Sequence, residues 1–251
     1  NVAVGYDAGT TVTTATENTL IGGIAGDALT TGSGNTAVGY SSLTTDTQGS
    51  KSTAIGRSAL ATQNHTTATD AYNTAVGYQA GVSVTTGVQN TLIGALAGDA
   101  LTDADSNVAV GYSALTTDTK GGRNVAIGQF ALNTQNFSTS TNSYNVAVGY
   151  NAGVSVTTGE QCTLIGGLAG DALTTGSALA IGYQAGSALT TSVGNVLVGE
   201  LAGAAVTTGA GNTALGSQAL STATTGGFNV AIGHDALRYS TATGNTAVGY
   251  N

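Results

Sequence analysis

A glycine that returns once in every short repeat constrains the fold of this chain more than any other feature. It is the fifth residue of a motif close to Asn-Thr-Ala-Val-Gly-Tyr, which starts fifteen times between residues 1 and 245. The fifteen glycines are Gly5, Gly22, Gly39, Gly56, Gly77, Gly94, Gly111, Gly128, Gly149, Gly166, Gly182, Gly199, Gly216, Gly233 and Gly249. Most repeats are roughly 17 residues long, which is too short for the common helical repeats of about 33 or more and for leucine-rich repeats of about 20–29. One coil of a β-solenoid fits this period.

We therefore predict an all-β fold, a parallel β-solenoid or β-roll of about 14 complete coils, each of roughly 16–21 residues. The motif itself should form one short strand. The Thr-rich stretch that follows, as in residues 82–86, is β-branched and should form a second strand. Coils of this kind stack with each strand parallel to its equivalent, about 4.8 Å away.

A longer period lies above the shorter one. Residues 1–72 and 73–144 are equivalent, and residues 145–251 continue the pattern less regularly. Residues 1–251 are therefore read as a single continuous repeat array, and we expect it to be a fragment of a longer fibre.

Composition excludes several classes of protein. Charged residues make up 7% of the chain, against about 25% in an ordinary domain. Five Lys and Arg residues and a pI near 4.2 argue against nucleic-acid binding, and no apolar run is long enough to span a membrane. A lone cysteine, Cys162, excludes an intrachain disulfide. No catalytic motif is present, so we expect no enzymatic activity, no cofactor and no metal.

The recurring glycine also suggests association between chains. Glycine within a strand costs about 0.5–1 kcal/mol relative to alanine, so its retention indicates either a backbone conformation closed to other residues or a very close backbone neighbour. Both faces of the strand are apolar or small, with residues like Val4 on one side and residues like Ala3 and Gly5 on the other. A strand without a polar face is usually covered on both sides. We therefore expect several chains to pack together through this strand.

These residues resemble a known family. The pattern Asn-Thr-Ala-Val-Gly-x-x-Ala, repeated along the whole chain, is similar to the YadA-like head repeat of trimeric autotransporter adhesins and to arrays in bacteriophage tail fibres. The resemblance implies a left-handed coil, a homotrimer, and an extracellular location on a bacterial cell or on a virion. The family's usual coil is shorter, so the coils here should carry longer outer loops.

The two longest repeats, which start at Ser52 and Asn124, are the best lead to a binding site. Each is longer than its neighbours and should bulge from the fibre, where recognition usually occurs. The candidate surface-recognition residues in these loops are Asn64, His65, Tyr72, Asn136, Phe137 and Tyr144. A decorative variation in loop length is the alternative interpretation.

Other repeated positions have simpler interpretations. The Asn at the first position is interpreted as a stacked amide ladder that satisfies hydrogen bonds between coils, with Cys162 as a drifted member of it. Tyrosines at the sixth position of alternate repeats could bind sugar rings or could lie over small neighbours. Aspartates such as Asp27, Asp99 and Asp171 are interpreted as solvated turn residues rather than calcium ligands.

The function we expect is that of a structural and adhesive fibre segment that presents attachment sites to glycans or to a protein receptor on a host or other surface. A plain structural spacer or filament is one alternative. Another is a monomeric ice-binding solenoid that uses rows of Thr-Thr pairs, such as Thr30-Thr31 and Thr85-Thr86.

Overall fold

The computed structural model describes residues 1–250, and within them the chain is an all-β parallel β-solenoid of about 15 turns without a helix. The predicted fold class is confirmed. Since no helix forms, none of these residues belongs to a helix long and apolar enough to cross a membrane. Two compact units are present. Unit 1 comprises residues 1–124 and 136–142, and unit 2 comprises residues 125–135 and the chain from residue 143 onward.

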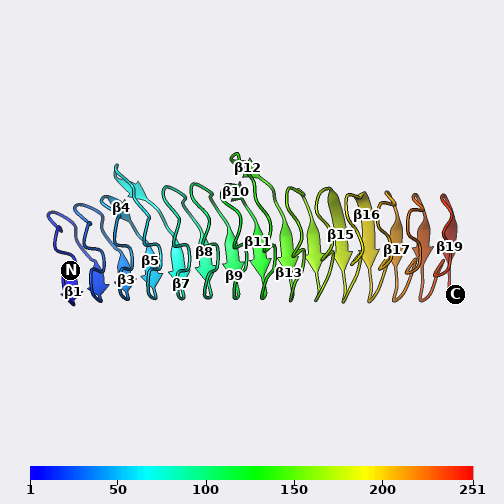
Figure 1. Cartoon of the computed structure of the whole chain (residues 1–251), viewed down its shortest axis with the longest axis horizontal. Helices are drawn as coiled ribbons and strands as arrows, with labels where there is room; N and C mark the ends of the chain where they lie inside the picture. The colour runs from blue at the N-terminus through cyan, green and yellow to red at the C-terminus, as the bar shows by residue number, and fades with distance from the viewer. Residues whose placement is uncertain (251) are drawn as a thin grey trace. The chain divides into compact units, whose positions relative to one another are not determined.

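The strands of each unit's main sheet lie side by side in chain order (Figure 1). In unit 1 these strands are β1 (Val2–Val4), β2 (Thr19–Ile21), β3 (Thr36–Val38), β5 (Thr53–Ile55), β7 (Thr74–Val76), β8 (Thr91–Ile93) and β9 (Val108–Val110). In unit 2 they are β11 (Val125–Ile127), β13 (Val146–Val148), β14 (Thr163–Ile165), β15 (Ser177–Ile181), β16 (Val193–Val198), β17 (Thr213–Leu215), β18 (Val230–Ile232) and β19 (Thr246–Val248).

Register is regular apart from one shift at Ser177/Ala178 between β15 and β16, so each position of the repeat forms a row. Between β2 and β3, for example, Leu20 pairs with Ala37 and Ile21 pairs with Val38. Successive side chains of a strand point to opposite faces. The third position therefore points into the coil, where Leu20 and Ala37 are fully buried, whereas the second and fourth positions point outward.

The predicted second strand is wrong for most coils. The Thr-rich stretch forms turns and bends. Its hydroxyls add to the backbone hydrogen bonds that reach the next coil, because the backbone N–H of Thr30 also donates to the carbonyl of Thr47, at 2.9 Å. Thr30 Oγ1 donates to the carbonyl of Thr47 at 2.9 Å, and Thr85 Oγ1 donates to that of Thr102 at 3.1 Å. Within residues 1–250, short strands outside the main sheet occur only beside the long repeats, as the pairs β4 (Gly49–Ser50) with β6 (Thr69–Asp70) and β10 (Gly121–Gly122) with β12 (Thr141–Asn142).

The recurring glycine is required by its own chain. Gly77 has a φ of +142°, and a Cβ at this position would lie 2.5 Å from the carbonyl oxygen of Gly94 in the next coil. Both reasons expected from the sequence therefore apply, but the close backbone neighbour belongs to the same molecule. The argument that these glycines mark contact with a second chain is wrong, and any case for association has to rest on the outward side chains.

The first-position asparagines form the predicted ladder. Asn90 Nδ2 donates to the carbonyl of Ala104 at 2.8 Å, which closes its own coil. Its Oδ1 accepts the backbone N–H of Asn107 at 3.0 Å, which fixes the next coil. Each buried amide thus holds two levels of the solenoid together.

Candidate functional surfaces

The outward face of the main sheet carries a row of aliphatic side chains that are exposed or half-buried. Its fourth position is Val, Ile or Leu in every strand, and Ile21 and Ile93 are 39% and 40% exposed. Its second position is Thr or an aliphatic residue. Neither row contains a charge, so each unit presents a flat, uncharged and largely apolar surface.

The tyrosines at the sixth position of alternate repeats pack against small residues in neighbouring coils. A Cβ added to Gly23 would meet the Tyr40 ring at 3.2 Å, and one added to Gly167 would meet the Tyr183 ring at 3.5 Å. Where the neighbour is larger it stacks, since the Arg57 guanidinium lies 5.9 Å from the centre of the Tyr78 ring. The interpretation of these tyrosines as fillers between coils is supported at these positions, although the rings remain exposed.

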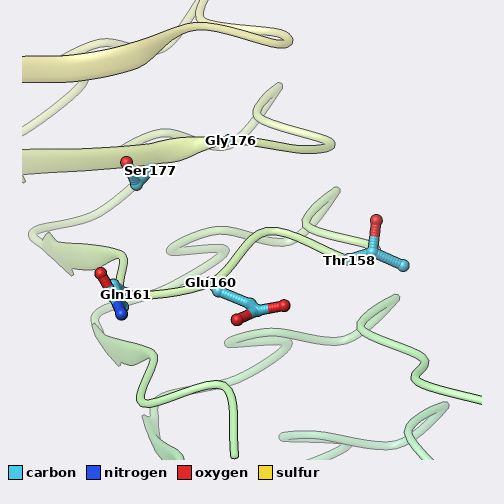
Figure 2. Close-up of a pocket in the computed structure, with 5 residues that line it drawn as sticks. All are labelled: Thr158, Glu160, Gln161, Gly176 and Ser177. Atoms are coloured by element: carbon cyan, nitrogen blue, oxygen red, sulfur yellow. The ribbon is translucent and has the colours of Figure 1, made fainter. Parts of the chain in front are cut away.

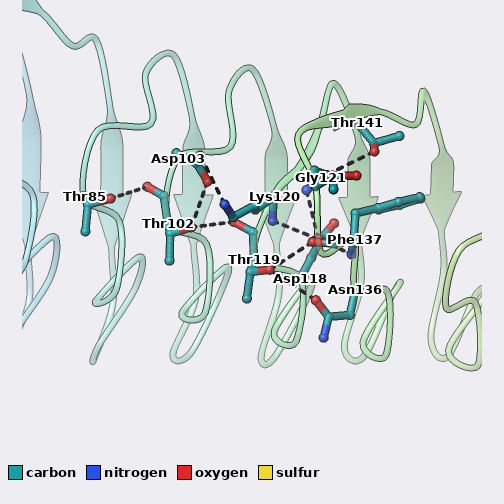
Figure 3. A network of polar contacts seen from close by, with 11 residues as sticks. Thr85, Thr102, Asp103, Asp118, Thr119, Lys120, Gly121, Asn136, Phe137 and Thr141 are labelled. Carbon is teal, nitrogen blue, oxygen red and sulfur yellow. Dashed lines mark hydrogen bonds and ion pairs between the residues drawn. The ribbon is translucent and has the colours of Figure 1, made fainter.

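A buried acid lies under each long repeat. The twelfth position of a coil is a Val or Leu in eight repeats, but it is Asp46 and Asp118 in the coils just before the two insertions. Asp118 Oδ1 accepts the backbone N–H groups of Gly121 at 2.9 Å and of Phe137 at 3.1 Å (Figure 3). Asp46 Oδ1 accepts those of Gly49 and His65, both at 3.0 Å. These carboxylates fix the start of each insertion against the coil before it.

The polar core continues into the insertion coil itself. Gln63 also occupies a twelfth position and is fully buried. Its Nε2 donates to Asp46 Oδ2 at 2.5 Å, and its Oε1 accepts a hydrogen bond from Asn73 Nδ2 at 2.8 Å. Such a network is stable because each polar group has a partner. These residues were not expected from the sequence, although a polar residue at an otherwise aliphatic position was a usable signal.

The candidate recognition residues divide into two groups. His65 and Phe137 are only 5% and 6% exposed, so the prediction that they lie on exposed loops is wrong. Each points inward because the acid described above holds its backbone N–H. Asn64 is half-buried and Asn136 is exposed, and the Oδ1 of each accepts a Thr hydroxyl from the preceding coil at 3.2 Å. Tyr72 and Tyr144 are exposed as predicted.

Tyr72 belongs to a compact charged cluster in unit 1. Lys51 Nζ lies 2.6 Å from Asp70 Oδ2, 3.2 Å from the Tyr72 hydroxyl and 5.1 Å from the centre of its ring. The hydrogen bond to Asp70 raises the pKa of Lys51 and lowers that of the carboxyl group. Both charges are half-exposed, so solvent weakens their attraction.

A hollow lies in unit 2, at a coil that is one residue short. It has a volume of about 330 Å³ and is lined by Thr158, Glu160, Gln161, Gly176 and Ser177 (Figure 2). A smaller hollow of about 180 Å³ shares Gln161 and Ser177 with it and continues toward Leu179 and Val196.

Cys162 takes the place of a ladder asparagine in this short coil. It is fully buried, its backbone N–H donates to Asn145 Oδ1 at 2.9 Å, and its Sγ lies 3.5 Å from the carbonyl oxygen of Gly176. Burial raises the pKa of the thiol to about 11, so the reactive thiolate is scarce at neutral pH. These contacts fit the interpretation as a ladder residue.

Metal-ligating side chains are dispersed. Residues 1–250 contain no group of three or more His, Cys, Asp or Glu side chains that could hold an ion. Asp99 and Asp171 lie far apart in sequence, and partial burial raises the pKa of each.

Comparisons with known proteins add no relative. No protein-family model, curated protein or solved structure matches this chain.

Proposed function

We propose that this chain is a structural and adhesive segment of an extended surface fibre, in which three copies associate side by side. The observation that carries the proposal is the outward row of aliphatic side chains, which continues through every strand without a charge. Extended exposed apolar surfaces of this kind mark protein interaction sites. Sheets buried on both faces also have the composition seen in these strands.

The size of the face sets how strong the association should be. Three residues span about 10 Å along a strand and seven strands span about 34 Å across a sheet, so the face of unit 1 projects roughly 340 Å². A stable interface buries about 800 Å² per partner. Association should therefore need many coils acting together, which suits a long repetitive fibre better than a compact dimer.

The proposal includes where the fibre is located and what it binds. A fibre like the YadA-like heads and the tail-fibre arrays would be left-handed, homotrimeric and extracellular, on a bacterial cell or a virion, and would hold attachment sites for glycans or a protein receptor away from that surface. It would have no catalytic role. Tyr72 and Tyr144, on the long repeats, remain exposed for such contacts.

Replacing two outward residues tests the proposal. The double variant Ile55→Lys, Ile93→Lys places charges in the outward row and should shift the molar mass measured by light scattering from trimer to monomer. Thr67→Lys, at the exposed tip of the first long repeat, is the matched control and should leave the trimer intact. A wild type that is monomeric at every concentration would rule the proposal out.

A second candidate function, ice binding, is favoured by one row of hydroxyls. Thr19, Thr36, Thr53, Thr74 and Thr91 occupy the second position of five neighbouring strands in unit 1. No hydrogen bond within residues 1–250 engages their hydroxyls, whereas the first hydroxyl of pairs such as Thr30-Thr31 and Thr85-Thr86 donates to the next coil. A monomeric protein with thermal hysteresis that Thr53→Val reduces would favour this function over the fibre.

A further inference from the structure

Three irregularities of unit 2 coincide at one place. The coil that starts at Cys162 is one residue shorter than the coils on either side of it. Cys162 and Ala178 replace two successive asparagines of the ladder. The 330 Å³ groove lies at the same coil, between Gln161 and Ser177 (Figure 2).

The missing residue explains the groove. In regular coils the residue before the first position turns the corner with a positive φ, as Tyr144 (53°) and Gln161 (58°) do. The short coil has no such residue, because Ser177 pairs with Val193 and Ala178 pairs with Asn195, so that Gly194 has no counterpart in it. The next two corner residues along the sheet are Gly194 and Gly211. The row of corner side chains is therefore interrupted between Gln161 and Phe228, and the hollow lies beside Gln161.

The lining chemistry selects a class of ligand. Glu160 supplies carboxylate acceptors, Gln161 supplies an amide that both donates and accepts, and Thr158 and Ser177 supply hydroxyls. None of the residues that line the groove is a cation, and the chain has a net charge of −8, so an anionic ligand would be repelled. A neutral molecule rich in hydroxyl groups satisfies this set of donors and acceptors.

Apolar contacts are available next to the polar ones. Leu179 and Val196 line the adjoining 180 Å³ hollow. The exposed Tyr144 lies one coil before Gln161. The backbone N–H of Gln161 donates to the carbonyl of Ser143, the residue next to Tyr144, at 2.8 Å. A pyranose ring has both the hydroxyl edge and the C–H faces that such surroundings complement.

We propose that this groove is a binding site for a neutral hexose unit of a glycan, held by hydrogen bonds to Glu160 and Gln161. The inference rests on the proposed adhesive function and deepens it, because it moves glycan attachment from the long repeats to the short coil. The groove is open, so a unit inside a longer glycan chain can enter it as readily as a terminal one.

Ligand-observed saturation-transfer NMR with methyl glucoside, methyl galactoside and methyl mannoside tests the site. At least one of these sugars should bind saturably, and Glu160→Gln and Gln161→Ala should each weaken binding at least tenfold. Gln89→Ala, at the equivalent corner of unit 1, is the matched control and should bind like the wild type. All three substitutions are at exposed positions, so circular dichroism should confirm unchanged folding.

Three results would overturn the site. One is the absence of saturable binding up to about 100 mM sugar, far above a millimolar Kd. Another is wild-type affinity in Gln161→Ala. The third is a marked preference for glucosamine that Glu160→Gln abolishes, since this would make the ligand a cationic amino sugar.

The test is separable from that of the fibre. Light scattering on the same samples reports self-association independently of sugar binding. A trimer that binds none of the sugars would reject the groove alone, and a sugar-binding monomer would reject the fibre alone.

Discussion

The side-chain Oδ1 of Asn73 accepts the backbone N–H of Asn90 at 2.9 Å, although the two residues lie 17 positions apart. The same relationship recurs in other coils, for example from Asn195 to Asn212 at 2.9 Å. Because each of these asparagines also closes its own coil, one buried amide contributes to both the shape and the stacking of the coils. The ladder is therefore the main polar element that holds the repeats in register.

Replacing one asparagine of the ladder should destabilise the protein. Asn90→Ala leaves the N–H of Asn107 and the carbonyl of Ala104 buried without their partners. Each unsatisfied group costs about 1–3 kcal/mol, so the free energy of unfolding should fall by about 2–6 kcal/mol. Urea denaturation measures this change, with the exposed Gln89→Ala as the control. A loss of less than about 0.5 kcal/mol would show that the ladder contributes little.

The buried acids should determine the order of the insertions. Asp118→Ala removes the acceptor of the Gly121 and Phe137 N–H groups. We expect faster hydrogen exchange over residues 136–142, with the strands β7 and β8 still protected. Exchange that stays unchanged in the insertion would show that other contacts hold it.

The once-per-coil glycine should tolerate no side chain. Gly77→Ala forces a left-handed backbone on alanine and places its Cβ against the Gly94 carbonyl, so it should cost more than about 3 kcal/mol or prevent folding. Gly34→Ala is the control, because its φ is also positive (+69°) but its Cβ would have no neighbour closer than 3.8 Å. It should cost about 1–2 kcal/mol, the ordinary penalty for alanine in a left-handed conformation. Equal losses in thermal denaturation would contradict the close approach.

Asp171→Asn should stabilise the protein at neutral pH. Burial raises the folded-state pKa of Asp171 above the ordinary 3.8, and its Oδ1 is buried without a partner within residues 1–250. A raised carboxyl pKa means that the wild type loses stability as the pH rises through the interval between the unfolded and folded values. The variant should therefore have the higher Tm at pH 7 and little advantage below pH 3.8.

Asp27→Asn provides the control for that comparison. Asp27 occupies the equivalent position of its coil, but its Oδ1 accepts the hydroxyl of Thr44. It should gain less than Asp171→Asn at pH 7. A lower Tm for Asp171→Asn at pH 7 would contradict the effect of burial.

Features that recur in nearly every coil could be predicted from the sequence, whereas features of single irregular coils could not. The glycine and asparagine positions predicted the solenoid and its ladder because they recur in almost every coil. The prediction of a second strand was wrong because the Thr-rich stretch turns rather than extends. The backbone N–H and the hydroxyl of Thr30 both donate to the carbonyl of Thr47, and this contact between coils needs no extended strand. His65 and Phe137 were placed outside because loop length alone does not show a buried acid one coil away.

The groove could not be read from the sequence for a related reason. A repeat that is one residue short is visible in the spacing, but the spacing does not show whether the missing residue leaves a strand, a turn or a corner. The structure places the deletion at the corner, where Ser177 pairs with Val193 and Gly194 has no counterpart in the short coil.

Hydroxyl-radical footprinting of dilute and concentrated protein, read by mass spectrometry, tests most directly which surface joins the copies. The account predicts that oxidation of Ile21, Ile55 and Ile93 falls as the protein assembles, while oxidation of Tyr72 stays constant. Equal oxidation of the three isoleucines at all concentrations, or protection confined to Tyr72, would contradict it.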